Sequence, residues 1–183
     1  MEYFILFLPL VAAIISGFFG NIIGKKGSQI ITSLFITITA LLSFVVLYKV
    51  INFSYSENLI IATWINSGNL NVSWSIKIDT LSAVMLVVVT FVSALVHIYS
   101  IGYMADDPHK PRFMAYLSLF TFAMLTLVTS DNFLQLFFGW EGVGLCSYLL
   151  IGFWYKKETA NNAAIKAFIV NRIGDFGLAI AIF

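Results

Sequence analysis

Long apolar runs, interrupted by short polar stretches, make up most of the chain. Charges mark the ends of these runs, because no Asp, Glu, Lys or Arg occurs in residues 3–24, 27–48, 80–105 or 113–130. A helix needs about 20 apolar residues to cross ~30 Å of hydrocarbon. We therefore predict six membrane-spanning helices, at residues 3–23, 29–50, 79–103, 112–130, 132–155 and 163–183.

The stretch between the second and third predicted helices is too polar for the bilayer core. Two runs rich in β-branched and aromatic residues, 59–65 and 72–76, flank the Asn-Ser-Gly-Asn sequence of residues 66–69. Such runs around a Gly/Asn turn are typical of a β-hairpin. The pattern thus predicts an all-α polytopic membrane protein with a small extramembrane β-hairpin between helices 2 and 3. Trp64 and Trp74 are expected near the membrane interface.

Composition excludes most other classes of protein. Hydrophobic residues make up 60% of the 183 residues and charged residues only 10%, whereas a soluble domain carries about 25% charged residues. The net charge of +1, without a clustered basic face, argues against nucleic-acid binding. A single cysteine, Cys146, excludes a disulfide framework and a multi-cysteine metal or iron–sulfur site.

The distribution of Lys and Arg predicts the orientation in the membrane, because positive residues concentrate in cytoplasmic loops. The loops after the first, third and fifth predicted helices hold six of them: Lys25, Lys26, Lys110, Arg112, Lys156 and Lys157. The opposite side holds Lys49 and Lys77. We therefore expect the N-terminus and the hairpin on the periplasmic or intermembrane side.

The predicted elements divide the chain into four segments: residues 1–51 (helices 1 and 2), 52–78 (hairpin loop), 79–111 (helix 3 and a cytoplasmic loop) and 112–183 (helices 4 to 6). The last predicted helix stops at Phe183 without a flanking charge, Gly, Pro or polar cap. We therefore expect either a truncated chain or more protein after this residue.

Glu141 is the strongest functional candidate. It lies ten residues after Asp131, which places it about 15 Å along a helix and near the bilayer centre. An ionisable residue at that depth costs at least ~2.5–3.5 kcal/mol on insertion, so it is a functional candidate by default. Gly139, Gly142 and Gly144 leave room around it for a neighbouring helix or for water. The alternative is a permanently neutral glutamic acid that hydrogen-bonds an adjacent helix.

The sixth predicted helix carries three charges. Arg172 and Asp175 are three residues apart, so they face each other on a helix. They form either a self-neutralising pair or a pair that exchanges partners with Glu141. Lys166 is a further proton-transfer candidate, although it lies near the helix start and could extend to the interface instead.

His97 lies within the third predicted helix. Histidine can relay protons near neutral pH, but a lone buried histidine is more often only hydrogen-bonded. Asp79, Asp107 and Arg112 lie at boundaries or in a loop and are predicted to be solvated. The candidates together predict a chain of titratable groups for proton transfer, with no catalytic, cofactor or metal site.

Four sequence runs resemble one family, the largest antiporter-like membrane subunit of respiratory complex I, called subunit L in bacteria and subunit 5 in mitochondria. The most specific is Trp140-Glu-Gly-Val-Gly-Leu-Cys-Ser-Tyr148. The other three begin at Asp79, His97 and Lys166 and read Asp-Thr-Leu-Ser, His-Ile-Tyr-Ser-Ile-Gly-Tyr-Met and Lys-Ala-Phe-Ile-Val-Asn-Arg-Ile-Gly-Asp-Phe-Gly. Their order and spacing fit the family over the whole chain.

The resemblance implies proton translocation driven by quinone reduction elsewhere in the complex. Glu141 matches the family's fifth-helix glutamate, whose partner is a lysine on the seventh helix, and Arg172 and Asp175 match charges of the same network. Residues 112–183 would begin the first antiporter-like repeat. Flavin, iron–sulfur clusters and quinone would be held by other subunits, and the partners would be membrane-arm subunits, the lipid bilayer and protons. The chain would lie in a bacterial plasma membrane or a mitochondrial inner membrane.

The sequence stops before the seventh helix, so it is not expected to complete a transmembrane proton path alone. Two alternatives stay open. One is a subunit of a multi-subunit sodium/proton antiporter. The other is a non-pumping fragment of a split gene.

Overall fold

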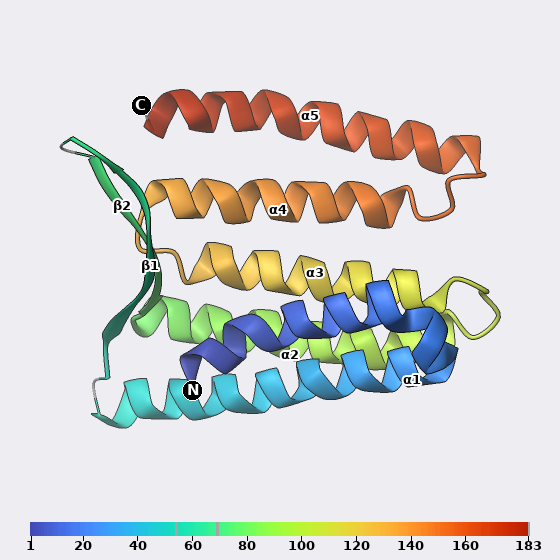
Figure 1. The fold of residues 1–183 in the computed structure, drawn as a ribbon, viewed down its shortest axis with the longest axis horizontal. Coiled ribbons are helices and arrows are strands. Elements are labelled where there is room, and N and C mark those ends of the chain that lie inside the picture. Colours follow the sequence, from blue (N-terminus) through green and yellow to red (C-terminus); the bar gives the residue numbers. More distant parts are fainter. Residues whose placement is uncertain (54, 69, 183) are drawn as a thin grey trace.

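The computed structural model describes residues 1–53, 55–68 and 70–182, which form five helices and one two-stranded sheet. The elements in chain order are α1 (Glu2–Phe53), β1 (Glu57–Ser67), β2 (Leu70–Ile78), α2 (Thr80–Tyr103), α3 (Lys110–Val128), α4 (Phe133–Ile151) and α5 (Glu158–Ile182). The helices run roughly alongside one another, with the hairpin across one end and α5 along one edge (Figure 1). Helix α3 packs on α1, α2 and α4, and α4 packs on α5.

Helix α1 reverses direction at Gly24. The backbone of Gly24 is non-helical, with φ 82° and ψ 165°, a conformation that only glycine adopts readily. The two arms, residues 2–23 and 25–53, therefore run back along each other (Figure 1). The reversal lies between the first two predicted helices, 3–23 and 29–50.

Four helices, α1 to α4, are long and apolar enough to cross a membrane. The predicted number of six crossings is not confirmed on this criterion. Helix α1 counts once, although the non-helical backbone of Gly24 divides it into two arms. Helix α5 is excluded because Lys166, Arg172 and Asp175 all lie in its apolar part.

The helix boundaries differ from the hydropathy pattern at two places. Helix α4 ends at Ile151 rather than at residue 155, because Gly152 caps it and the aromatic residues that follow form a turn. Helix α5 was expected to begin at residue 163, with the apolar run. It begins earlier, at Glu158. An acidic residue in the first turn stabilises a helix, although its charge disfavours burial in a membrane.

The predicted start of α2 at residue 79 is confirmed by a capping box. The Asp79 carboxylate accepts a hydrogen bond from the Ser82 backbone N–H (2.8 Å), and the Ser82 hydroxyl accepts one from the Asp79 N–H (2.7 Å). These reciprocal bonds satisfy two amides that the helix leaves unpaired. The bond from the Ser82 amide holds the pKa of the Asp79 carboxyl below its ordinary value. Asp79 is therefore a structural cap and not only the solvated residue that was expected.

The predicted hairpin is confirmed, with longer strands than expected. Strands β1 and β2 pair antiparallel from Glu57 opposite Ile78 to Ser67 opposite Leu70. Gly68 adopts a φ of 58°, which suits a tight hairpin turn, and Asn69 lies outside the described residues. The pairing shifts at two places along β1, where bulges bend the strand.

The core lies at the hairpin end of the bundle, where several elements meet. It joins both arms of α1 to β2, α2 and α3, and its buried members are Ile5, Leu6, Val46, Val50, Ile76, Ile78, Ala83, Leu86 and Leu125. Where a region faces water, burying an Ile or Leu side chain stabilises the fold by about 1.5–3 kcal/mol relative to leaving it exposed. This cluster therefore fixes the hairpin to the helix ends.

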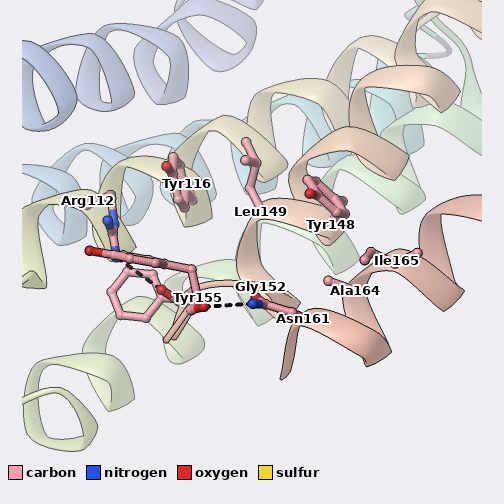
Figure 2. A pocket seen from close by; sticks show the side chains of 10 residues that line it. Arg112, Tyr116, Tyr148, Leu149, Gly152, Tyr155, Asn161, Ala164 and Ile165 are labelled. Atoms are coloured by element: carbon pink, nitrogen blue, oxygen red, sulfur yellow. Dashed lines mark hydrogen bonds between the residues drawn. The ribbon is translucent and has the colours of Figure 1, made fainter. Parts of the chain in front are cut away.

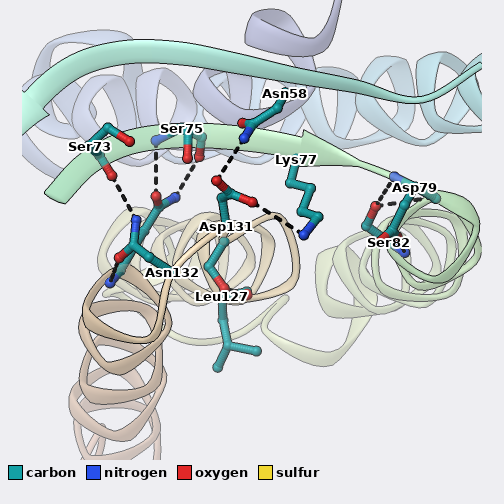
Figure 3. A network of polar contacts seen from close by, with 11 residues as sticks. Asn58, Ser73, Ser75, Lys77, Asp79, Ser82, Leu127, Asp131 and Asn132 are labelled. Atoms are coloured by element: carbon teal, nitrogen blue, oxygen red, sulfur yellow. Dashed lines mark hydrogen bonds and ion pairs between the residues drawn. The ribbon is translucent and has the colours of Figure 1, made fainter. Parts of the chain in front are cut away.

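Side-chain amides attach the hairpin to the first turn of α4 (Figure 3). The Gln135 side chain, fully buried, donates to the Ser75 carbonyl (2.7 Å) and accepts from the Ser75 N–H (3.0 Å). The Asn132 side chain caps α4 through the Gln135 N–H (2.8 Å) and donates to the Ser73 carbonyl (2.8 Å). Strand β2 is thus bound directly to the helix that carries Glu141.

An ion pair beside these bonds strengthens the same junction (Figure 3). Lys77 Nζ lies 3.2 Å from one carboxylate oxygen of Asp131, and the Asn58 side-chain amide donates to the other (2.6 Å). Both strands therefore contact the loop before α4. Since the pair is partly exposed, we expect it to add less than about 1 kcal/mol.

Replacing Gln135 with alanine is expected to loosen this junction. The Ser75 N–H and carbonyl would lose their partner in a buried place, and unpaired buried groups destabilise by about 1–3 kcal/mol. We expect a loss of about 1–2 kcal/mol, seen as a lower apparent melting temperature of the purified membrane complex that contains the chain. Asn58→Ala, at the exposed rim of the junction, is the control. Equal melting temperatures for the two variants would contradict the role of Gln135.

Candidate functional site

Glu141, Arg172 and Asp175 come together between α4 and α5. One guanidinium nitrogen of Arg172, Nη1, contacts Glu141 Oε2 in an ion pair and lies 3.7 Å from Asp175 Oδ2. Helix α4 supplies Glu141, and Arg172 and Asp175 share a face of α5 because they are three residues apart. A single cation is thus shared by two carboxylates on neighbouring helices.

Trp140 completes this cluster. Its indole N–H donates a hydrogen bond to Asp175 Oδ1 at 2.8 Å, so the two oxygens of Asp175 face different partners. Trp140 was not predicted as a site residue, because a tryptophan in an apolar helix is typical of packing. Its position next to Glu141 was the available signal, since an indole N–H inside a membrane needs an acceptor.

The three charged groups differ in their exposure within the described chain. The Asp175 side chain is 10% exposed, the Glu141 side chain 24% and the Arg172 side chain 46%. Arg172 also lies over the Phe168 ring, 4.7 Å from its centre. The carboxylates are therefore more enclosed than the cation they share.

A cavity of about 390 Å³ adjoins the cluster between α3, α4 and α5. Its walls are largely apolar, but Ser147, Asn171 and Asp175 contribute polar groups. Liquid water takes about 30 Å³ per molecule and needs two to four polar partners when enclosed. The cavity therefore has the room and the polar groups for water molecules next to Asp175.

Glycines bring α4 close to α3 beside this cavity. A Cβ atom on Gly139 would lie 2.7 Å from both the Cα and the N of Leu127, and one on Gly142 would lie 3.0 Å from the Ala123 Cβ. These two glycines were expected to leave room for a neighbouring helix, and α3 is that helix. Gly144 faces α5 instead, where a Cβ would lie 3.9 Å from the Asn171 side chain.

His97 lies apart from this cluster, and its polar contacts all go to α2 and α3. The ring is fully buried, and Nδ1 lies 2.8 Å from the Ser93 carbonyl. A carbonyl only accepts, so we assign the proton to Nδ1, and Nε2 then accepts from the Ser118 hydroxyl at 3.1 Å. The Ser93 hydroxyl also bonds that of Thr121 (2.6 Å). These bonds fasten α2 to α3. They agree with the alternative in which His97 is only hydrogen-bonded and does not relay protons.

Lys166 does not join the cluster either. Its side chain is exposed on α5, and it forms no ion pair with any residue that the structure describes. Because α5 begins at Glu158, Lys166 lies about two turns into the helix rather than near its start.

The prediction that Arg112 is solvated is wrong. Arg112 is half-buried, donates from Nη2 to the Phe153 carbonyl (3.0 Å) and stacks over the Phe153 ring. The physical reason is that the turn after α4 packs on the first turn of α3. Hydropathy alone does not place two such segments together.

Two family models match the chain. Residues 64–114 match one described as NADH-ubiquinone oxidoreductase (complex I), chain 5 N-terminus. Residues 130–183 match one described as NADH:quinone oxidoreductase/Mrp antiporter, TM. The second match covers Glu141, Arg172 and Asp175.

Curated relatives match the chain over its whole length. NADH-ubiquinone oxidoreductase chain 5 of Triticum aestivum is 55% identical over 183 residues, which is 100% of this chain and 27% of the relative. NADH-quinone oxidoreductase subunit L of Rhodobacter capsulatus is 53% identical over 189 aligned residues, with 100% and 26% covered. The chain therefore spans about a quarter of the length of these relatives.

A solved structure shares the fold. A chain in the membrane-bound sulfane sulfur reductase, described as an archaeal respiratory membrane complex, superposes with a TM-score of 0.77 at 18% identity. The match covers 95% of this chain and 34% of that one. With the family models and the relatives in view, the chain belongs to the family of complex I chain 5 and subunit L, a family of multi-pass membrane proteins.

Proposed function

We propose that this chain forms part of a proton-translocating membrane subunit of a respiratory NADH:quinone oxidoreductase. The observation that carries the proposal is the shared cation, Arg172, which pairs with both Glu141 and Asp175 between α4 and α5. Charged groups inside membrane helices are costly and mark ion pathways. The family to which the chain belongs gives the same indication.

Glu141 is the proton-exchanging group in this proposal. A nearby cation favours the ionised form of a carboxylate, and a poorly solvated site favours the neutral form. In one arrangement Arg172 pairs with Glu141, and in the other it moves toward Asp175 and leaves Glu141 to exchange a proton with another group. The shift required is small, because Arg172 Nη1 already lies 3.7 Å from Asp175.

The energies involved are of a suitable size. One pKa unit corresponds to 1.36 kcal/mol, and moving one charge through 100 mV involves about 2.3 kcal/mol. A change of ion-pair partner in a poorly solvated site supplies a few kcal/mol. Coupling of proton transfer to such a change is therefore energetically feasible.

The other two proton-transfer candidates, His97 and Lys166, lie outside the cluster. His97 and Lys166 would take part in proton transfer only through groups outside the cluster, since neither contacts it. The redox cofactors would belong to other subunits, and the partners of the chain would be membrane-arm subunits of the complex.

The proposal includes the path of the chain through the membrane. The two arms of α1 and the four later helices would make six crossings, with α5 shielded from lipid by protein on its charged face. The bias of Lys and Arg would place the N-terminus and the hairpin on the periplasmic or intermembrane side.

A sodium/proton antiporter subunit is the second candidate, because one matching family model covers both classes. The test reconstitutes the full complex that contains the chain into vesicles and follows internal pH and membrane potential during quinone reduction. Charge movement that continues without sodium and acidifies or alkalises the lumen supports proton translocation. Charge movement that requires sodium would favour the antiporter class, and none at all would favour a non-pumping chain.

Trp140→Phe is expected to lower proton transport by roughly threefold, because a hydrogen bond of this kind is worth about 1 kcal/mol or somewhat less net. Asp175 would lose its bond from Trp140 and bind Arg172 more strongly, away from Glu141. Proton uptake per quinone reduced is the measurement. The same substitution at Trp64, in the hairpin, is the control. Unchanged transport in Trp140→Phe would show that Trp140 only packs.

A further inference from the structure

We propose that a cavity at the Arg112 end of α3, α4 and α5 binds the phosphodiester headgroup of an anionic phospholipid. The cavity measures about 430 Å³, and its lining residues come from the three helices and from the turn that follows α4 (Figure 2). It lies at the opposite end of α4 from the hairpin. The Glu141 cluster contributes none of its lining residues.

Arg112 supplies a positive charge without a counterion. Within residues 1–53, 55–68 and 70–182 it forms no ion pair, and its Nε is shielded from solvent without a hydrogen-bond partner. Its contacts are the Phe153 carbonyl at 3.0 Å and the rings of Phe153 and Tyr155, 4.7 and 5.4 Å from their centres. Among the described residues the guanidinium therefore contacts only a neutral carbonyl and two rings, and an anion in the cavity would form its first direct ion pair.

None of the described residues that line the cavity is acidic. The Asp107 carboxylate, in the loop before α3, is already bound: it accepts from the Trp154 indole (3.0 Å) and from the His109 N–H (2.7 Å). The nearby Lys157 lies over the Trp154 ring, 5.3 Å from its centre, and adds positive charge. The Asp107 carboxylate acts on Arg112 only at a distance and bonds Trp154 and His109 instead, so direct pairing with Arg112 is left to an anion from outside this part of the chain.

Uncharged donors line the same cavity as the guanidinium. The phenols of Tyr116, Tyr148 and Tyr155 line the cavity with Asn161, whose amide N–H donates to the Tyr155 carbonyl at 2.7 Å (Figure 2). Hydroxyl groups donate to phosphate oxygens, and the planar guanidinium matches two of them at once. This donor set fits a phosphodiester.

The depth of the cavity favours a lipid as the source of the phosphate. Helix α3 begins at Lys110 and α4 ends at Ile151, so the cavity lies where two membrane-length helices end together. The residues that follow α4, Trp154-Tyr-Lys-Lys157, are of the types enriched at the membrane interface. Leu149 and Ile165 give the cavity apolar lining, against which the glycerol and first methylenes of a lipid would lie. Basic pockets between membrane helices commonly bind such headgroups.

The test is photo-crosslinking in the purified membrane complex that contains the chain. The complex is placed in phosphatidylcholine nanodiscs that hold a minor fraction of a photoreactive phosphatidylglycerol, and crosslinked peptides are identified by mass spectrometry. We expect crosslinks in residues 148–165. Arg112→Gln should reduce them about tenfold or more, because a charge-assisted hydrogen bond is worth more than one to a neutral group. Lys156→Gln, which removes an exposed charge next to the cavity, should leave them unchanged.

Two further arms make the outcome decisive. Tyr148→Phe removes one donor without touching the Arg112–Phe153 bond, so its expected severalfold loss does not depend on folding of the Arg112 variant. Inorganic phosphate should not compete with the lipid. Competition by phosphate would contradict a lipid source. Equal crosslinking in Arg112→Gln and Lys156→Gln, or an acidic side chain of another segment or subunit found paired with Arg112, would overturn the proposal.

Discussion

Replacing Glu141 with glutamine is expected to lower proton transport per quinone reduced by about tenfold or more. Glutamine keeps the size of the side chain and can still bond Arg172, but it cannot gain or lose a proton. A tenfold change in rate corresponds to about 1.4 kcal/mol in the free energy of activation. The measurement is internal pH in vesicles that contain the assembled complex, with quinone reduction followed in parallel.

The control for Glu141→Gln is the same substitution at Glu158. Glu158 is exposed in the first turn of α5 and lies outside the cluster, so Glu158→Gln should transport protons normally. Glu141→Asp keeps an exchangeable carboxyl at shorter reach and is expected to retain part of the activity. Normal proton transport in a fully assembled Glu141→Gln complex would contradict the assigned role.

The broad fold followed from the sequence because membrane helices are set by local composition. The interval without charge after Asp79 gave α2 almost to the residue, and Gly24 separated the two arms of α1 where the apolar runs divide. The ends of α4 and α5 did not follow, because hydropathy measures apolarity and not helicity. After Ile151 the chain stays apolar but leaves the helix as an aromatic turn. At Glu158 the chain is polar but already helical.

The charges of the site were predicted, and part of their pairing was not. Arg172 and Asp175 are neighbours by helical spacing alone, and depth in the apolar run identified Glu141. The contact of Arg172 with Glu141 depends on how α4 packs on α5, so two pairings stayed open. Trp140 and Arg112 were missed for the same reason, because the acceptor of each comes from a segment distant in the sequence.

Replacing Gly139 with alanine is expected to destabilise the packing of α4 on α3 by about 3 kcal/mol, the upper part of the range for overpacking. The added Cβ would lie 2.7 Å from backbone atoms of Leu127. A side chain can turn aside, but a helix backbone cannot, so the two helices would have to separate. The apparent melting temperature of the purified complex and the yield of assembled complex report this loss.

Gly144→Ala separates packing from helix propensity, since both variants put alanine into α4. A Cβ at Gly144 would be at an ordinary contact distance of 3.9 Å from the Asn171 side chain, and alanine favours a helix over glycine by about 1 kcal/mol. We therefore expect Gly144→Ala to be neutral or slightly stabilising. Because Gly139 lies two residues before Glu141, its variant should also displace Glu141 from Arg172 and lower proton transport in the complexes that do assemble. Equal melting temperatures for the two variants would mean that α3 and α4 are not in close backbone contact at Gly139.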